Sequence, residues 1–203
     1  VFIETPTNPL LELSDISLTA DLCKAKNIKL AVDNTFMSPF GQRPLSLGAD
    51  VVMHSATKFI GGHSDLIAGA LITNNADMAE QLQFIQKSGG AIPSPFDCWI
   101  LLRSTKTMAL RVQKQSDNAF EIAQRLHQFN IFDEVIYPGL ETHPQQSLAK
   151  RQQLTPEGVP IYGSMISLRC GSVQKRDDFL SNLRLFTLAE SLGGVESLVC
   201  VPY

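Results

Sequence analysis

Lys58 closes the run Ser55-Ala56-Thr57-Lys58, and Asp33 lies upstream of it at the end of an apolar segment. A lysine amine forms a Schiff base with an aldehyde cofactor when a carboxylate keeps the cofactor's ring nitrogen protonated and hydroxyls receive its phosphate. Asp33 offers the carboxylate, and Ser55 and Thr57 offer the hydroxyls. Residues two apart in an extended segment point to the same side, so both hydroxyls can face one phosphate while Lys58 turns toward the ring. These residues therefore predict a cofactor held covalently by Lys58.

Two predicted strands place these groups. The apolar residues 28–32 form a buried strand with Asp33 at its carboxyl end, and residues 49–54 form a second strand that ends at Ser55. Around them we expect a strand at residues 1–3, a helix over 15–27, a strand over 66–73 and a helix over 76–87. Strands that alternate with helices form an open, mainly parallel α/β sheet, in which ligands gather at the carboxyl ends of the strands.

The second half of the chain predicts a long helix and then an α+β unit. Apolar residues at helical spacing run from Met108 to Leu126, and the charged Arg111 and Arg125 on the other face are interpreted as solvated surface. Beyond it we expect a strand over 131–137 and a proline-rich connection over 138–160. These are followed by a strand over 161–169, a helix over 174–183 and a last strand near Leu198. We expect a domain boundary in the connection, with domains over residues 1–140 and 141–203.

The composition excludes several classes of partner. The formal net charge is -3 and the basic residues are scattered among acids, so we expect no nucleic-acid partner. There is no apolar run long enough to span a bilayer and no leader at the start of the chain, so we expect no membrane and a cytoplasmic protein. The histidines lack zinc spacing and we assign no metal. The dispersed cysteines indicate thiols in a reducing compartment: Cys23, Cys98, Cys170 and Cys200.

The chain resembles the pyridoxal 5'-phosphate (PLP) enzymes of cysteine and methionine metabolism, the cystathionine γ-lyase and γ-synthase group. Five motifs in the family's order carry the resemblance, namely Glu4-Thr5-Pro6-Thr7-Asn8-Pro9, Val32-Asp33-Asn34-Thr35-Phe36, Ser55-Ala56-Thr57-Lys58, Gly62-His63-Ser64-Asp65 and Leu188-Ala189-Glu190-Ser191-Leu192-Gly193-Gly194. The resemblance implies a three-layer α/β fold with a mainly parallel sheet of the aspartate aminotransferase-like type (fold type I), followed by part of a smaller α+β C-terminal domain. Residues 1–140 would then be the C-terminal part of the large cofactor-binding domain.

The resemblance also implies roles for the cofactor-binding residues. Lys58 would carry PLP and act as the catalytic residue, Asp33 would hold the pyridinium nitrogen, and Ser55 and Thr57 would bind the phosphate. Thr35 matches a threonine packed against the cofactor ring. For the two hydroxyls the alternative is purely local, because a serine or threonine at a strand exit can satisfy backbone groups instead.

Three further residues are implied to lie near cofactor or substrate. Asn8 matches an asparagine near the phenolic oxygen of PLP and close to the substrate, and Ser191 matches a serine near the substrate carboxylate, with Glu190 beside it. Turn chemistry is the alternative for Asn8, which stands between two prolines, and for Glu190, which can cap a local turn.

The function implied is cleavage or formation of the C–S bond at the γ-carbon of cystathionine, with a sulfur amino acid as substrate and a homo-oligomer, a dimer or homotetramer with shared active sites, as the assembly. The γ-lyase reaction gives cysteine, 2-oxobutanoate and ammonia. The alternatives are a γ-synthase that uses an O-acylated homoserine and cysteine, and a cystathionine β-lyase, which residues 95–99 and 106–111 also resemble.

A second alternative is an incomplete, inactive fragment that acts only through its fold or oligomer contacts. Both ends of the chain are strand-like, so we expect a segment of a longer protein. Similar enzymes carry a phosphate loop and a ring-stacking tyrosine before the point that matches Val1, and a carboxylate-binding arginine beyond Tyr203. Residues 162–165 depart from the family's glycine-glycine-methionine pattern.

Overall fold

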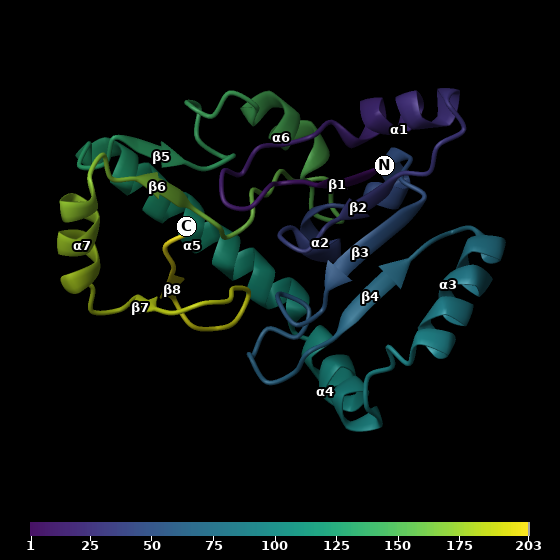
Figure 1. Cartoon of the computed structure of the whole chain (residues 1–203). Coiled ribbons are helices and arrows are strands. Elements are labelled where there is room, and N and C mark those ends of the chain that lie inside the picture. The colour runs from purple at the N-terminus through teal and green to yellow at the C-terminus, as the bar shows by residue number, and fades with distance from the viewer. Residues whose placement is uncertain (203) are drawn as a thin grey trace.

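A four-stranded sheet organises the first half of the chain (Figure 1). The structure is a computed structural model, and it describes residues 1–202. The strands are β1 (Phe2–Glu4), β2 (Ala31–Asp33), β3 (Val51–Ser55) and β4 (Gly69–Ile72), in that order across the sheet. β1, β2 and β3 are parallel, and β4 is antiparallel to β3. The predicted α/β class with a mainly parallel sheet is confirmed.

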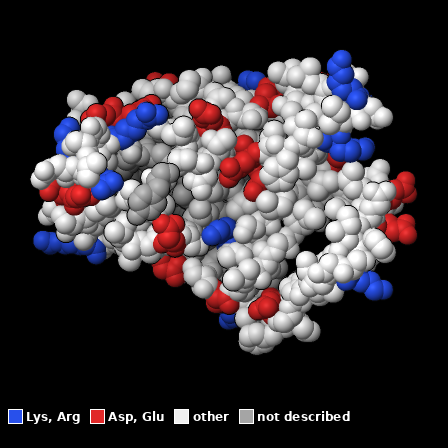
Figure 2. Space-filling model, in the orientation of Figure 1, with Lys and Arg blue, Asp and Glu red and all other residues white. Residues whose placement is uncertain are grey.

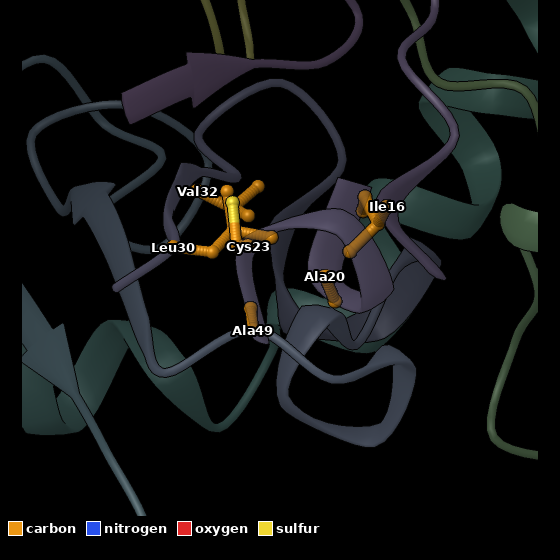
Figure 3. Packing of buried hydrophobic residues seen from close by; sticks show 6 residues of the cluster. All are labelled: Ile16, Ala20, Cys23, Leu30, Val32 and Ala49. Atoms are coloured by element: carbon orange, nitrogen blue, oxygen red, sulfur yellow. The ribbon is translucent and has the colours of Figure 1, made fainter. Parts of the chain in front are cut away.

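One face of the sheet is covered by helix α1 (Ile16–Ala25). The helix begins at Asp15, whose side chain accepts the backbone N–H of Leu18 and so satisfies a donor that the first turn leaves free. Its buried stripe packs against the start of β2 and the segment before β3, as Figure 3 shows. The buried cluster consists of Ile16, Ala20, Cys23, Leu30, Val32 and Ala49. This packing fixes the strands whose carboxyl ends carry Asp33 and Ser55.

The long helix α5 (Met108–Phe129) crosses the molecule from the neighbourhood of the sheet to the pair formed by β5 (Glu134–Ile136) and β6 (Ser167–Arg169) (Figure 1). Its buried residues Ala119 and Ala123 pack against a second cluster, which contains Tyr137. The Tyr137 hydroxyl donates to the carbonyl of Gly163 at 2.9 Å. α5 therefore contacts both halves of the chain.

The remaining elements are short or lie at the periphery. They are α2 (Ser38–Gly41), the 3-10 helix η1 (Pro44–Leu47), α3 (Ala76–Gly89), α4 (Pro95–Thr105), α6 (Gln146–Gln152), α7 (Val173–Ser181), β7 (Thr187–Leu188) and β8 (Leu198–Val199). None of the described helices is both long enough and apolar enough to cross a membrane. Figure 2 shows acidic and basic side chains dispersed over the face it presents.

Two helices differ from the sequence-based expectation. We predicted no element between residues 87 and 108, but α4 forms there: Ser94 caps it by accepting the N–H of Asp97, and Pro95 occupies its first turn. α6 lies inside the predicted connection over residues 138–160. The side chain of Gln152, at the end of α6, accepts the backbone N–H of Ile16 at 2.9 Å, so this segment packs onto α1.

The domain boundary at residues 140 and 141 stays a prediction. Residues just beyond it bond to the first half of the chain, since Arg43 donates to the carbonyls of Leu154 and Thr155 at 2.9 and 3.0 Å. Tyr203, the last residue of the second predicted domain, lies outside the described residues.

Candidate functional site

The carboxyl ends of β2 and β3 are tied together by Thr35. Its backbone N–H donates to Asp33 Oδ1 at 2.9 Å, and its hydroxyl oxygen accepts the backbone N–H of Ser55 at 2.8 Å. Because β2 and β3 are adjacent and parallel, their carboxyl ends lie at the same edge of the sheet. The structure therefore brings Asp33, Thr35 and Ser55 together.

Lys58 lies in a turn directly after β3. Its backbone N–H donates to the Ser55 carbonyl at 3.1 Å, and its own carbonyl accepts the N–H of Gly62 at 2.7 Å. Thr57 secures the other side of this turn, since its hydroxyl oxygen accepts the N–H of Ala68 at 3.0 Å and lies 3.3 Å from the Ala68 carbonyl. The local alternative for Thr57 is thus present. A phosphate role would require its hydroxyl hydrogen to turn from that carbonyl to the phosphate.

The Lys58 amine contacts Ser191 from the far end of the chain. Nζ donates to the Ser191 hydroxyl at 3.0 Å. Ser191 has a φ of 89°, a left-handed conformation that is uncommon for a residue with a side chain. The sequence resemblance predicts Ser191 near the substrate carboxylate, and the structure places it against the lysine. Glu190 beside it is exposed.

Asn8 and Glu4 extend the site to the third parallel strand. Glu4 ends β1 directly opposite Asp33, and its carboxylate accepts the backbone N–H of Asn8 at 3.4 Å. Burial raises the pKa of Glu4, and the nearby Asp33 charge raises it further, while the bond from Asn8 opposes both. The turn after β1 therefore holds Asn8 at the same edge of the sheet as Lys58. Sequence reasoning did not single out Glu4, since nothing in the sequence gives its register with Asp33.

His54, on β3, is the most perturbed histidine of this region. It is 2% exposed, and its Nδ1 has no hydrogen-bond partner among residues 1–202. Burial lowers the pKa of His54 to about 4, an effect that the Asp33 charge partly opposes. The imidazole is therefore neutral near pH 7. It is a core residue.

A cleft of about 690 Å³ is lined by Asn8 and Ser191, whereas Asp33, Ser55, Thr57 and Lys58 are not among its lining residues. Phe36 also lines it, together with α5 residues and the C-terminal strands. Asn8 and Ser191 thus share one cavity, although they stand at opposite ends of the sequence. This cavity has the size of a small-molecule site.

Arg111 corrects a sequence-based interpretation. We expected it on the solvated face of the long helix, but its guanidinium donates to three backbone carbonyls, those of Phe59, Ile60 and Ser104. Gln115, one turn further along α5, donates to the Gly194 carbonyl at 2.8 Å. Neither contact has a signal in the sequence, because the acceptors are backbone atoms distant along the chain.

The donor set at this edge fits PLP. The cofactor requires a carboxylate for its ring nitrogen, donors for its phosphate and an amine for its aldehyde. Asp33 supplies the carboxylate and Lys58 the amine, and the hydroxyl-bearing Ser55 and Thr57, two residues apart, lie between them on the chain. Thr35 occupies Oδ1 of the Asp33 carboxylate. The other carboxylate oxygen is the one that would meet a protonated ring nitrogen.

Comparison with known proteins gives a consistent result. Residues 1–203 match the family described as Cys/Met metabolism PLP-dependent enzyme. The chain is 51% identical over 203 residues to a cystathionine gamma-lyase of Dictyostelium discoideum, a match that covers 100% of this chain and 51% of the relative. It is 46% identical over 202 residues to a cystathionine beta-lyase of Lactococcus lactis subsp. cremoris, covering 100% of this chain and 52% of the relative.

A solved structure agrees with these sequences. The crystal structure of cystathionine gamma synthase from Xanthomonas oryzae pv. oryzae in complex with aminoacrylate and cysteine matches with a TM-score of 0.93 at 42% identity. The match covers 98% of this chain and 50% of that one. The chain therefore spans about half the length of the curated relatives it matches.

Proposed function

The chain belongs to the PLP-dependent enzymes of Cys/Met metabolism, and from this premise we propose that the full-length protein cleaves the C–S bond at the γ-carbon of cystathionine. The products would be cysteine, 2-oxobutanoate and ammonia. The cofactor of the family is PLP, and the predicted fold of the aspartate aminotransferase-like type is confirmed by the structural likeness. The observation that carries the proposal is the Lys58 amine, fixed 3.0 Å from Ser191 beside the joined ends of β2 and β3.

We assign the cofactor to the groups at this edge. Lys58 would hold it covalently, and Asp33 would face its ring nitrogen. Ser55 and Thr57 would receive the phosphate, Thr35 would pack against the ring, and Asn8 would lie near its phenolic oxygen and the substrate. When bound, PLP withdraws electrons from the α-carbon of an attached amino acid.

Asp33 has a defined electrostatic task in this proposal. A carboxylate at hydrogen-bonding distance favours the protonated form of a ring nitrogen, because opposite charges attract. Thr35 orients Asp33 for this task by donating to Oδ1.

Lys58 would move protons once the substrate amine has replaced it. A free lysine amine at the α-carbon is a suitable acid and base when its position is fixed. The Ser191 hydroxyl would keep that amine in place, which adds to its predicted position near the substrate carboxylate. Glu190 is assigned to the same end of the substrate, supported only by its place in the motif.

Two related reactions are the other candidates. Relatives and structures named cystathionine γ-lyase, γ-synthase and β-lyase match the chain at 40–51% identity. In the γ-synthase reaction a cysteine thiol adds in place of the departing group of an O-acylated homoserine. In the β-lyase reaction the C–S bond breaks on the cysteine side and gives homocysteine, pyruvate and ammonia. The third alternative, a fragment that acts only through its fold or oligomer contacts, applies if this chain occurs by itself.

Assembly, location and domain division complete the proposal. We infer a homo-oligomer, a dimer or tetramer with shared sites, from the family resemblance. The four cysteines are unpaired, which supports a reducing, cytoplasmic location. The boundary at residues 140 and 141 belongs to the proposal as well.

Product analysis of the full-length protein with PLP tests the function. With cystathionine, we expect 2-oxobutanoate and cysteine, and a visible absorbance of the bound cofactor that borohydride abolishes. The Lys58→Ala variant should lose both. Pyruvate and homocysteine would identify the β-lyase instead, and cystathionine made from an O-acylated homoserine and cysteine would identify the γ-synthase. Visible absorbance that survives Lys58→Ala would contradict the assignment of the lysine.

A further inference from the structure

One face of helix α5 holds the two segments that meet in the site. Arg111 and Gln115 are four residues apart, so their side chains lie on the same side of the helix, one turn from each other. Arg111 reaches the turn that follows Lys58, and Gln115 reaches the loop that contains Ser191. Lys58 and Ser191 are 133 residues apart in the sequence, yet their side chains form a hydrogen bond.

Arg111 fixes the Lys58 turn through its backbone. Nη1 donates to the Phe59 carbonyl at 2.8 Å and Nη2 to the Ile60 carbonyl at 3.2 Å. The same guanidinium is oriented by its own helix, because Nε donates to the Thr107 hydroxyl at 3.0 Å. A planar group with several donors in fixed directions can hold two adjacent carbonyls at once, which a lysine ammonium cannot match.

Gln115 fixes the Ser191 loop in the same manner. Its Nε2 donates to the Gly194 carbonyl at 2.8 Å, while its Oε1 is buried with no partner among residues 1–202. Apolar contacts join the same three segments, since Val112 of α5 and Phe59 belong to one buried cluster and the partly buried Leu192 packs against it. Hydrogen bonds and packing thus act on the residues immediately after Lys58 and Ser191.

Two glycines make this close approach possible. Gly62 has a φ of 71°, and a Cβ atom there would lie 1.9 Å from Arg111 Nη1. Gly193 has a φ of 82°, and its Cβ would lie 2.6 Å from the backbone nitrogen of Phe59. Any side chain at either position would push the Lys58 turn away from Arg111 or from the Ser191 loop. The two segments are therefore in backbone contact.

We propose that Arg111 and Gln115 are positioning residues that set the Lys58 amine against the Ser191 hydroxyl. The inference rests on the proposed function, in which Lys58 is the reacting amine. A lysine side chain has several rotatable bonds, so its amine is placed only if its backbone and its partner are both fixed. The left-handed φ of Ser191 also indicates that its segment is held in place, because such a conformation persists only when surrounding contacts determine it.

The first test concerns the turn alone and uses full-length protein prepared without PLP. In Arg111→Met the apolar stem remains but the three carbonyls lose their donors. We expect amide hydrogen exchange to rise about tenfold or more at Gly61 and Gly62, whose N–H groups close the turn. The exchange rate of these amides in Arg111→Lys should lie between the rates in the unmodified protein and in Arg111→Met. The matched control is Arg125→Met, which removes a solvent-exposed arginine of the same helix and should leave these amides unchanged.

The second test concerns the amine. With PLP added, we expect Arg111→Met and Gln115→Met each to slow borohydride-trappable labelling of Lys58 by about 10- to 100-fold, because small displacements of a reacting group have effects of that size. In a Ser191→Ala background, Gln115→Met should cause no further slowing, since Gln115 acts through Ser191. A merely structural role would slow both backgrounds equally.

The outcomes separate the inference from the proposed function. If the unmodified protein does not label at Lys58, the proposed function fails, and the exchange data still test whether Arg111 fixes the turn after Lys58. If Lys58 labels but Arg111→Met changes neither exchange nor labelling, the role of Arg111 is wrong. Equal slowing by Gln115→Met with and without Ser191 would overturn the role of Gln115. If Arg111→Met does not fold, Arg111→Lys is used for the exchange and labelling measurements, and Gln115→Met still tests the labelling of Lys58.

Discussion

The edge of the sheet around Lys58 and the arm formed by β4, α3 and α4 differ in how the chain covers them. At the Lys58 edge, Thr35, Arg111 and Gln115 bond to backbone groups of distant segments, and Phe59 is buried. In the arm, α3 has no buried residue at all, and large apolar side chains of both helices are exposed, among them Phe84, Ile85, Phe96, Trp99 and Leu102. The arm stands at one side of the molecule, beyond β3 (Figure 1).

This difference shows where the chain's own stability is concentrated. Folding is driven mainly by burial of apolar surface, so exposed side chains of the arm contribute little within this chain. At the site edge, Val32 of the α1 cluster directly precedes Asp33, and Phe59, which follows Lys58, belongs to the buried cluster that contains Val112 of α5. The positions of Asp33, Ser55 and Lys58 are therefore determined by the same packing that stabilises the fold.

The largest expected effect compares two leucines. Leu30 is 0% exposed in the α1 cluster, and Leu102 is 68% exposed in α4. Leu30→Ala should lower the free energy of unfolding by about 2–5 kcal/mol, because it removes buried methyl groups and leaves a cavity. Leu102→Ala should change it by about 0.5 kcal/mol or less. Urea unfolding measures both, and similar losses would mean that the arm is packed in solution as tightly as the core.

The second effect is a pH dependence that originates at the site edge. Burial lowers the pKa of His54 from its usual 6.5 to about 4, so between these two pH values the unfolded chain binds the proton and the folded chain does not. Stability is then fully present above pH 6.5 and is lost as the pH falls toward 4, by up to about 3 kcal/mol. The free energy of unfolding of His54→Gln, measured from pH 4 to 7, should change less with pH than that of the unmodified protein. The exposed His127→Gln is the control, and a curve unchanged by His54→Gln would contradict the assignment.

The third effect removes one hydrogen bond at the junction of β2 and β3. Thr35→Val keeps the shape of the side chain but leaves the Ser55 N–H without its acceptor, which should cost about 1–3 kcal/mol. It should also weaken PLP binding, because Asp33 and Ser55 are no longer tied together. Thr105→Val in the arm removes a hydroxyl that donates within its own helix and should cost less. Equal losses in urea unfolding would show that Thr35 has no special role.

The sequence predicts the strands of the site well, and the reason is local. Apolar runs that end in Asp33 and Ser55 identify buried strands with polar groups at their carboxyl ends, so both the elements and the edge can be inferred. The direction of β4 cannot be inferred, because a strand pattern has the same period in either direction. α4 was missed because its start, Ser94-Pro95, is also a turn signal, although the same residues cap a helix.

Contacts between segments that are distant along the chain cannot be predicted from the sequence. Arg111 has the helical spacing of a solvated residue, yet its partners are carbonyls some fifty residues away. The bond between Thr57 and Ala68 and the bond between Lys58 and Ser191 likewise depend on how loops close in three dimensions. The motifs bring Ser191 to attention, but only the structure places it against the lysine.

Peptide mapping after borohydride reduction tests the central claim, that Lys58 holds the cofactor. The full-length protein is loaded with PLP, reduced, digested and analysed by mass spectrometry. We expect the reduced cofactor on the peptide that contains Lys58, in amounts near one per chain, and no comparable label on another lysine. A label of that size on any other lysine, or none on Lys58 in protein that has bound PLP, would contradict the account.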